Sequence, residues 1–439
     1  MFTFKQFLHQ EVKPALGCTE PGAVALAVAR ASQELESRDA IARVAVVVSD
    51  GIYKNGMVVG IPGTNGARGN AMAAAMAAFC GKAEYGLQVL QDCDPDLVAT
   101  AARMIEEGRV TVSCHPEKHG VYVEAVVEAP PHIAVCIIEG DHSNIVKVSL
   151  DGNIRFEKTM VAADQSVQNS IPDLLTEMSY SEIFALLDQL DGEDVDYLME
   201  GVRLNKAIAE YGLQQDSVSG LSLGKTLKNL IDAKKVEGDL TNLIKSYCYA
   251  AADARMAGAR LSVMSSAGSG NHGLAAILPI AILGEQLGKD RVAIARALAL
   301  SHLSTSMVKS KLGRLSAICG CAVAAGAGAA AGLTYLMGGT VEQCAKAMKT
   351  LLASTAGMLC DGAKGSCSLK VGTAAGEAYL AALFALQDCG VDFPQGVVDH
   401  TLEQTTANMG RINREGMRDM DQVMIDILVD RNLKQSAHR

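Results

Sequence analysis

A chain of 439 residues is long enough for one large domain or two to three ordinary ones, and its net charge of −10 argues against nucleic acid or an anionic membrane as the main partner. Aromatic residues make up only 4% of the chain, which leaves few platforms for stacking bases. The first residues lack a basic segment followed by an apolar core, so we expect a cytoplasmic protein whose 12 cysteines are reduced thiols or metal ligands.

Helix and strand signals alternate in the first 108 residues, which predicts an α/β region. A helix should run from Thr19 to about Leu35, because Cys18 or Thr19 can cap it and Pro21 suits its first turn. The remaining elements expected in this region are a strand at 41–48 and helices at 71–80 and 95–107.

Turn and strand signals follow. Asn55-Gly56 and Asn65-Gly66 have the composition of tight turns and would flank an apolar strand. Residues 110–156 change to an alternation of apolar and polar residues, interrupted by Pro, Gly and Asp. This pattern predicts short strands that form a small antiparallel sheet.

From Ser179 onward apolar residues recur at three- and four-residue spacing, which predicts an almost wholly helical chain. Residues 322–341 are uncharged and long enough to span a membrane, but their Ala and Gly content favours a buried helix. We therefore predict an α+β fold: an N-terminal α/β region (1–108) and a small antiparallel β region (109–160), followed by a large all-α domain (161–439).

The segment SSAGSGNHGL (Ser265–Leu274) is a candidate binding loop. It leads into a helix N-terminus, where free N–H groups and the helix dipole favour a carboxylate or a phosphate. It is neither a Walker A loop nor a dinucleotide fingerprint. The alternative is a glycine-rich turn between helices, and His272 alone would more often be a capping or core residue.

The segment GCTEP (Gly17–Pro21) places the Cys18 thiol at a helix N-terminus, where the dipole can lower its pKa toward thiolate formation. Glu20 beside it acts in the opposite direction. The alternative is a buried, inert cysteine.

Four cysteines, Cys319, Cys321, Cys360 and Cys367, lie in glycine-rich and nearly uncharged sequence. Cys360 and Cys367 flank a tight DGAKGS turn, and three thiolates brought together in this way suit a soft metal or an iron–sulfur cluster. The spacing is not that of a ferredoxin or of paired CxxC zinc ligands. Scattered core thiols remain the alternative.

The motifs GCTEP, KNGMVVGIPGT, HSNIV, DARMAGA, GSGNHG, LSHLS, RLSAIC and MLCDGAKGSC occur in the order found in bacterial and archaeal L-cysteine desulfidases. The chain resembles this family, which is related to the α-chain of iron–sulfur L-serine dehydratases, over essentially its whole length. The resemblance implies a [4Fe–4S] cluster and no pyridoxal phosphate.

Residue by residue, the resemblance implies that Cys319, Cys360 and Cys367 are the cluster ligands, with Cys321 as the alternative to Cys319. It implies that Cys18 is the base for the Cα proton or an extra ligand. Relatives can carry Gln in place of His272, which argues against a mandatory acid–base role for this residue. The substrate carboxylate would be held by one of two segments: Ser269, Gly270, Asn271 and His272, or Lys54, Asn55 and Gly56.

The implied function is conversion of L-cysteine to pyruvate, ammonia and hydrogen sulfide by α,β-elimination at an open iron. Dehydration of L-serine is the alternative within the same class. A non-catalytic amino-acid or redox sensor and a structural zinc protein are the alternatives from other classes. We expect a small amino acid as the ligand, neither nucleic acid nor membrane as a partner, and a homodimer as the candidate assembly.

Overall fold

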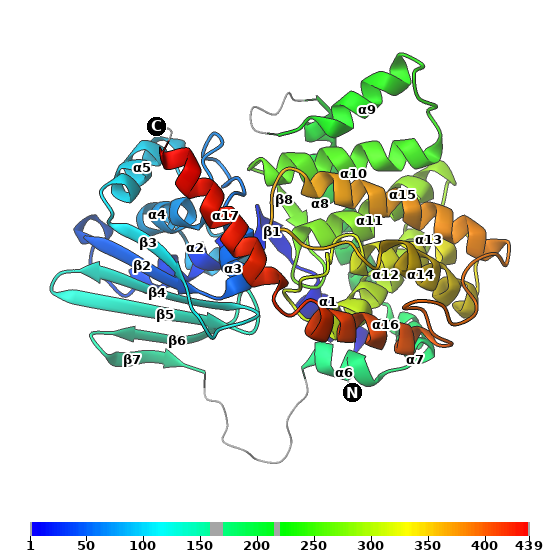
Figure 1. The fold of residues 1–439 in the computed structure, drawn as a ribbon, viewed down its shortest axis with the longest axis horizontal. Coiled ribbons are helices and arrows are strands. Elements are labelled where there is room, and N and C mark those ends of the chain that lie inside the picture. The colour runs from blue at the N-terminus through cyan, green and yellow to red at the C-terminus, as the bar shows by residue number, and fades with distance from the viewer. Residues whose placement is uncertain (1, 159–169, 215–219, 438–439) are drawn as a thin grey trace.

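The computed structural model describes residues 2–158, 170–214 and 220–437. It confirms the α+β class. A body built on a β-sheet and a larger helical body lie side by side (Figure 1).

A six-stranded sheet with strand order β3-β2-β4-β5-β6-β7 forms the core of the first body. Its strands are β2 (Arg43–Val48), β3 (Val110–Cys114), β4 (Tyr122–Ala129), β5 (His132–Glu139), β6 (Ile145–Leu150) and β7 (Asn153–Glu157). The strands predicted in the 109–160 region are present, but they do not form a sheet of their own. Strand β2 lies between β3 and β4, and it pairs parallel with β3 and antiparallel with β4. The boundary predicted at residue 108 therefore cuts through one sheet.

Helices made of small residues cover one face of this sheet. α2 (Thr19–Ser32) and α4 (Asn70–Cys80) pack on each other, and α2 also contacts β4 and β5. The alternate residues of β2, Val44, Val46 and Val48, are buried on this side. Ala and Val side chains allow the helices to approach each other and the sheet closely. The other helices of this body are α3 (Asp50–Gly56) and α5 (Val98–Glu106).

The two Asn-Gly pairs do not flank a strand. Asn55 and Gly56 end the helix α3, and within residues 57–69 the only pairing between strands is an isolated bridge of Gly60 with Arg68. Gly56 is a packing residue rather than a turn residue, because a Cβ atom there would collide with the side chain of Asn70. The predicted strand and the turn at Asn55-Gly56 were therefore wrong, whereas Asn65 and Gly66 do form a turn, with positive φ at both residues.

The helical body contains the second core. Its helices are α6 (Ile171–Glu177), α7 (Tyr180–Ala185), α8 (Gly192–Gln214), α9 (Leu223–Asp232), α10 (Leu240–Met256), α11 (Gly270–Gln286), α12 (Arg291–Leu312), α13 (Ala324–Leu336), α14 (Val341–Thr355), α15 (Cys367–Leu386) and α16 (Leu402–Arg411). The Ala- and Gly-rich helix α13 is buried between α11, α12, α14 and α15, as predicted for this segment. Among the described helices, α15 is the one long and apolar enough to cross a membrane, and half of its most apolar window is buried within the protein.

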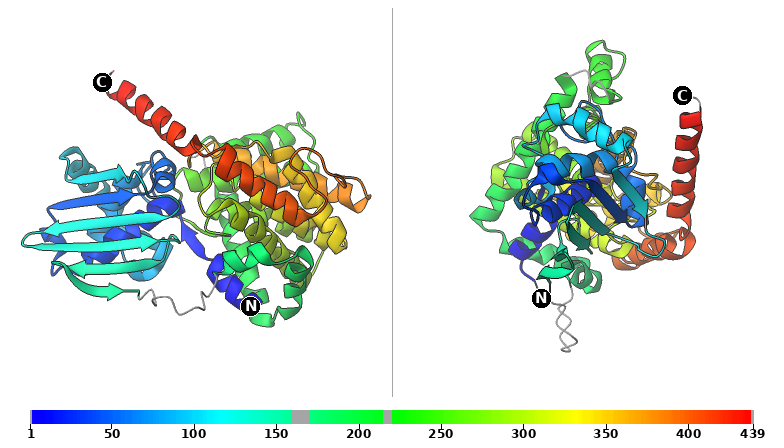
Figure 2. Two further views of the ribbon diagram at one scale, coloured as in Figure 1. Left: turned by 60° about the horizontal axis from the view of Figure 1, so that its bottom comes forward. Right: turned by 90° about the vertical axis from the view of Figure 1, so that its left-hand side faces the viewer.

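Both ends of the chain cross between the two bodies (Figures 1 and 2). The N-terminal helix α1 (Phe4–Glu11) contributes to the core of the helical body, and β1 (Pro14–Leu16) then pairs with β8 (Ser262–Met264). The C-terminal helix α17 (Met420–Ala437) leaves the helical body and contacts α3. Contacts formed by both chain ends therefore hold the junction of the two bodies together.

One of the expectations about the cysteines was wrong. Cys80, at the end of α4, forms a disulfide with Cys93, and their Cα atoms lie 5.3 Å apart. The chain between them folds back toward the end of α4, which brings the two residues together. No pattern in the sequence predicted that Cys80 and Cys93 would lie close to each other. The other ten cysteines are free.

A buried ion pair fixes α17 on α3. The Lys54 side chain is 1% exposed, and its ammonium group lies 2.6 Å from a carboxylate oxygen of Asp421. Asp421→Asn removes the counter-charge of a buried cation, so we expect it to lower the free energy of unfolding by about 3 kcal/mol. Asp232→Asn breaks the exposed Lys228–Asp232 pair and should cost less than about 0.5 kcal/mol. Denaturant unfolding of both variants measures the difference, and equal midpoints would contradict it.

Candidate functional site

A small cavity of about 70 Å³ lies where the two bodies meet. The N-terminal ends of α2, α11 and α15, the C-terminal ends of α3, α10 and α12, and the non-helical segments between helices supply its walls. The lining residues with side-chain chemistry are Cys18, Glu20, Asn55, Arg255, Ser269, Asn271, His272, Lys309, Arg314, Ser316, Cys319, Cys321, Cys360, Cys367 and Lys370.

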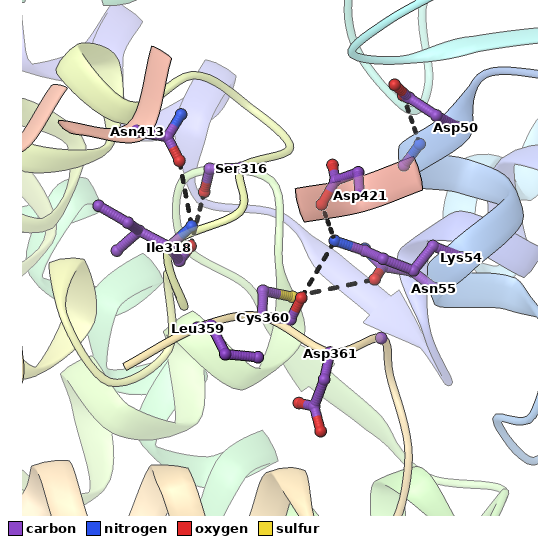
Figure 3. Close-up of polar contacts among 12 residues, drawn as sticks. Asp50, Lys54, Asn55, Ser316, Ile318, Leu359, Cys360, Asp361, Asn413 and Asp421 are labelled. Atoms are coloured by element: carbon purple, nitrogen blue, oxygen red, sulfur yellow. Dashed lines mark hydrogen bonds and ion pairs between the residues drawn. The ribbon is translucent and has the colours of Figure 1, made fainter. Parts of the chain in front are cut away.

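A short antiparallel contact brings two of the thiols together. Ile318 and Leu359 form an isolated β-bridge, the Cys319 amide donates to the Met358 carbonyl at 2.9 Å, and the Cys360 amide donates to the Ala317 carbonyl at 2.6 Å. Figure 3 shows Ile318 and Leu359 on these adjacent segments. Cys319 and Cys360, far apart in sequence, therefore lie on neighbouring strands of backbone.

The two thiols of the RLSAICGC segment differ in protonation. A hydrogen bond from Cys321 lowers the pKa of Cys319, although burial opposes this, and the Ala322 amide and the charge of Lys370 act in the same direction. The same hydrogen bond, together with burial, raises the pKa of Cys321 well above its usual range. Cys319 is therefore the thiolate and Cys321 its donor, which favours Cys319 as the metal ligand of the two.

Two lysines accompany the thiols. Burial lowers the pKa of Lys309 to about 8, although the charges of Cys360, Cys321 and Cys319 oppose this, and its ammonium group donates to the Ser316 hydroxyl at 2.7 Å. Lys370 pairs with Asp361 and donates to the Leu359 carbonyl at 2.7 Å. These cations favour thiolates in the cavity.

The donor set fits a cluster by its chemistry. Cys319, Cys321, Cys360 and Cys367 all line the same cavity, and thiolates are the ligands of iron–sulfur clusters. Over the described ranges, no group of three or more His, Cys, Asp or Glu side chains lies close enough together to hold a metal ion.

A hydrogen-bonded network connects the first helix of the site to the thiols. The Cys18 thiol donates to one carboxylate oxygen of Glu20 at 2.8 Å, and Asn55 Nδ2 donates to the other at 2.8 Å. Asn55 Oδ1 lies 4.0 Å from the Cys360 sulfur, as Figure 3 shows. Burial, and then the charge of Glu20, raises the pKa of Cys18 well above its usual range. Cys18 is therefore a protonated donor to Glu20 in this structure, and its expected role as the base stays a prediction.

The SSAGSGNHG segment forms a turn, and four of its residues also line the cavity. Ser269 occupies the N-cap position of α11 without a side-chain capping bond, and the Asn271 side chain accepts a hydrogen bond from Arg255 at 2.9 Å. His272 Nδ1 donates to the Ser266 carbonyl at 3.1 Å, and burial lowers its pKa to about 3, so the imidazole is neutral. His302 Nδ1 lies 2.8 Å from the Ser266 hydroxyl. Ser266 therefore positions both histidines.

Most of the residues expected in the site line the cavity: Cys18, Asn55, Ser269, Asn271, His272, Cys319, Cys360 and Cys367. Three others do not. The Lys54 ammonium group is bound to Asp421 and to the Cys360 carbonyl (Figure 3), and Gly56 packs against Asn70. Gly270 provides space for the Arg255 guanidinium, which a Cβ atom would displace. These residues shape the site and do not face its cavity.

The sequence interpretation gave no role to Arg255, Lys309 or Lys370, and treated Glu20 only as a neighbour of Cys18. Arg255 lies in the small-residue segment DARMAGA at the C-terminal end of α10, which served in the sequence only as one of the family motifs. Lys309 carried no signal that separates it from the neighbouring Lys311.

Comparison with known proteins identifies the family. Residues 84–426 match the family model described as the serine dehydratase alpha chain. The chain belongs to this family. It is also 44% identical over 431 residues to a UPF0597 protein of Kosmotoga olearia, a match that covers 98% of this chain and 99% of the relative. UPF0597 proteins of Desulfatibacillum aliphaticivorans and Clostridioides difficile are 42% and 38% identical, covering 98% and 97% of this chain and 98% and 99% of their own lengths.

These matches confirm the predicted relationship to the iron–sulfur serine dehydratase α-chain. Members of that family are in general iron–sulfur dependent, and the relationship supports a lyase in the broad sense. The names of the relatives specify no substrate.

The protonation of Cys18 leads to a test. Cys18→Ala removes the hydrogen bond to the charged Glu20, worth about 1.5–3 kcal/mol, so kcat/KM should fall about 10- to 100-fold. Cys18→Ser keeps a donor and should retain most of the activity. Steady-state kinetics of both variants at matched iron content makes the comparison. A Ser variant as inactive as the Ala variant would contradict the donor role and restore Cys18 as a base.

Proposed function

We propose that the protein is an iron–sulfur-dependent L-cysteine desulfidase, which converts L-cysteine to pyruvate, ammonia and hydrogen sulfide without pyridoxal phosphate. The observation that carries the proposal is the convergence of Cys319, Cys360 and Cys367 on one small cavity, which Glu20, Arg255 and Lys309 also line. Membership of the serine dehydratase alpha chain family supports it.

The three thiolates of Cys319, Cys360 and Cys367 would hold the cluster, with Cys321 as a hydrogen-bond donor to Cys319. A [4Fe–4S] cluster with three protein ligands has one open iron, which supplies a Lewis acid that assists departure of the substrate's sulfur or oxygen. The side chains around the cavity would bind the amino acid and accept its Cα proton.

Lys309 is the proposed acceptor of the Cα proton. A general base works best when its pKa is close to the working pH, and burial lowers the pKa of Lys309 to about 8. In the reaction the Cα–H bond breaks toward Lys309, and the C–S bond breaks with its electron pair leaving as sulfide. The aminoacrylate that forms tautomerises and hydrolyses to pyruvate and ammonia.

Dehydration of L-serine is the second candidate, and the family match favours it. The residues matched, 84–426, include the four thiols, Arg255 and Lys309, so the same groups would eliminate water in place of sulfide. A hydroxyl and a thiol differ little in size, and no residue of the cavity distinguishes them on charge.

The proposal is tested by the products of the reaction. The enzyme, purified and loaded with iron and sulfide under anaerobic conditions, should release pyruvate and sulfide in equal amounts from L-cysteine. Pyruvate from L-serine alone would favour the dehydratase, and binding without turnover of either amino acid would favour a sensor.

The ligand set is tested in the same assay. Cys319→Ala, Cys360→Ala and Cys367→Ala should each lose both the cluster and the activity, whereas Cys321→Ala should keep the cluster. Cys389→Ser, at an exposed position outside the cavity, is the matched control.

Lys309→Gln should lower kcat about 100-fold or more at matched iron and sulfide contents, because it removes the proposed proton acceptor. Lys311→Gln is the control, since Lys311 lies on the same helix but donates to the Thr176 carbonyl outside the cavity. In the wild type, kcat for the amino acid that is turned over should rise as the pH passes about 8, because only the neutral amine accepts a proton. Full activity of Lys309→Gln would exclude Lys309 as the base.

A further inference from the structure

Arg255 is a buried cation without a carboxylate partner. The residue is 1% exposed, and its Nη1 donates to the Asn271 side chain at 2.9 Å. Its Nε and Nη2 atoms have no hydrogen-bond partner within the described part of the chain. Burying a guanidinium with two unsatisfied nitrogen atoms is unfavourable unless a ligand satisfies them.

The free groups of Arg255 suit one kind of ligand. Nε–H and Nη2–H form one edge of the guanidinium, which matches the two oxygens of a carboxylate. The guanidinium lies against Gly270, where α11 begins, and this 17-residue helix adds the positive end of its dipole. Both features favour an anion at this end of the cavity.

Glu20 supplies the opposite charge in the same cavity. It is 7% exposed, and its carboxylate accepts hydrogen bonds from Cys18, Thr19 and Asn55. Burial would raise the pKa of Glu20, but the charge of His142 and the hydrogen bonds from Cys18 and Asn55 bring it below its ordinary value. No Lys, Arg or His side chain among the described residues forms an ion pair with Glu20, and Arg255 forms none with any carboxylate.

We propose that Arg255 and Glu20 together bind the zwitterionic head of an α-amino acid, Arg255 taking the carboxylate and Glu20 the ammonium group. Two opposite charges that line one small cavity without pairing with each other are complementary to a ligand that carries both. The side chain of the bound amino acid then extends toward Cys319, Cys360 and Cys367. This inference rests on the proposed function for the identity of that side chain.

The experiment uses two ligands, each of which carries only one of the two charged groups of an amino acid. 3-Mercaptopropionate has the thiol and the carboxylate, and cysteamine has the thiol and the ammonium group. Their binding to the cluster-loaded protein is measured by calorimetry under anaerobic conditions. Arg255→Gln should weaken 3-mercaptopropionate about tenfold or more and leave cysteamine within about twofold, while Glu20→Gln should do the reverse.

Arg260→Gln is the matched control, because Arg260 binds the backbone carbonyls of Gln91 and Cys93 and does not line the cavity. Arg255→Gln that binds 3-mercaptopropionate as tightly as the wild type would overturn the proposal. Should either variant fail to fold, the wild type decides: L-cysteine methyl ester, which lacks the carboxylate charge, must bind at least about tenfold more weakly than L-cysteine, and equal binding overturns the proposal.

The two proposals fail separately. A wild type that binds 3-mercaptopropionate through Arg255 but turns over neither L-cysteine nor L-serine would sink the proposed lyase and leave the zwitterion site standing. If the wild type turns over L-cysteine but Arg255→Gln binds 3-mercaptopropionate as tightly as the wild type, the lyase stands and the zwitterion site is contradicted.

Discussion

The buried ammonium group of Lys54 is the contact on which the junction of the two bodies depends. It donates to the backbone of Cys360, 306 positions later in the chain, and pairs with Asp421, 367 positions later. The next residue, Asn55, faces both the Cys360 sulfur and the Glu20 carboxylate. One short helix therefore sets the positions of the Cys360 thiol, the Glu20 carboxylate and the C-terminal helix. Because breaking such a pair leaves a charge buried without a partner, the junction favours a single arrangement.

The cavity that results is a charged site in a weakly polar environment. Thiols lie near Lys309 and Lys370, and the two neighbouring histidines are neutral because burial lowers the pKa of each to about 3. In such surroundings an electrostatic contact is stronger than in water, and an unsatisfied charge is more costly. The unsatisfied groups of Arg255 are therefore the clearest indication of a missing ligand. Arg255 is positively charged and Glu20 is negatively charged. A site with both charges is complementary to the zwitterionic head of an amino acid, the proposed substrate.

Local patterns of the sequence predicted the elements but not their assembly. The helices at the GCTEP and SSAGSGNHG segments, the alternating strands and the buried Ala-Gly helix follow from caps and periodicity, and the structure confirms them. The insertion of β2 between β3 and β4 depends on pairing between distant segments, which periodicity does not encode. The same holds for the Ile318–Leu359 bridge that unites Cys319 with Cys360.

The differences between the expected site and the structure have physical causes as well. Lys54 and Asn55 lie next to each other in sequence, but the helix α3 turns one toward Asp421 and the other toward the cavity. Cys18 stands at a helix N-terminus, where the dipole favours a thiolate, but burial and Glu20 raise its pKa by more than the dipole lowers it. Arg255 could not be assigned in advance, because its proposed role rests on two guanidinium nitrogens, Nε and Nη2, that have no partner among the described residues of the folded protein.

The central claim is that three cysteines hold a cluster with one iron open to the substrate. Mössbauer spectroscopy of the protein reconstituted with iron-57 tests it most directly. L-cysteine or L-serine should change the spectrum of about a quarter of the iron, corresponding to one site of a [4Fe–4S] cluster, and leave the rest unaltered. A spectrum that is insensitive to both amino acids, or a protein that incorporates no iron, would contradict the claim.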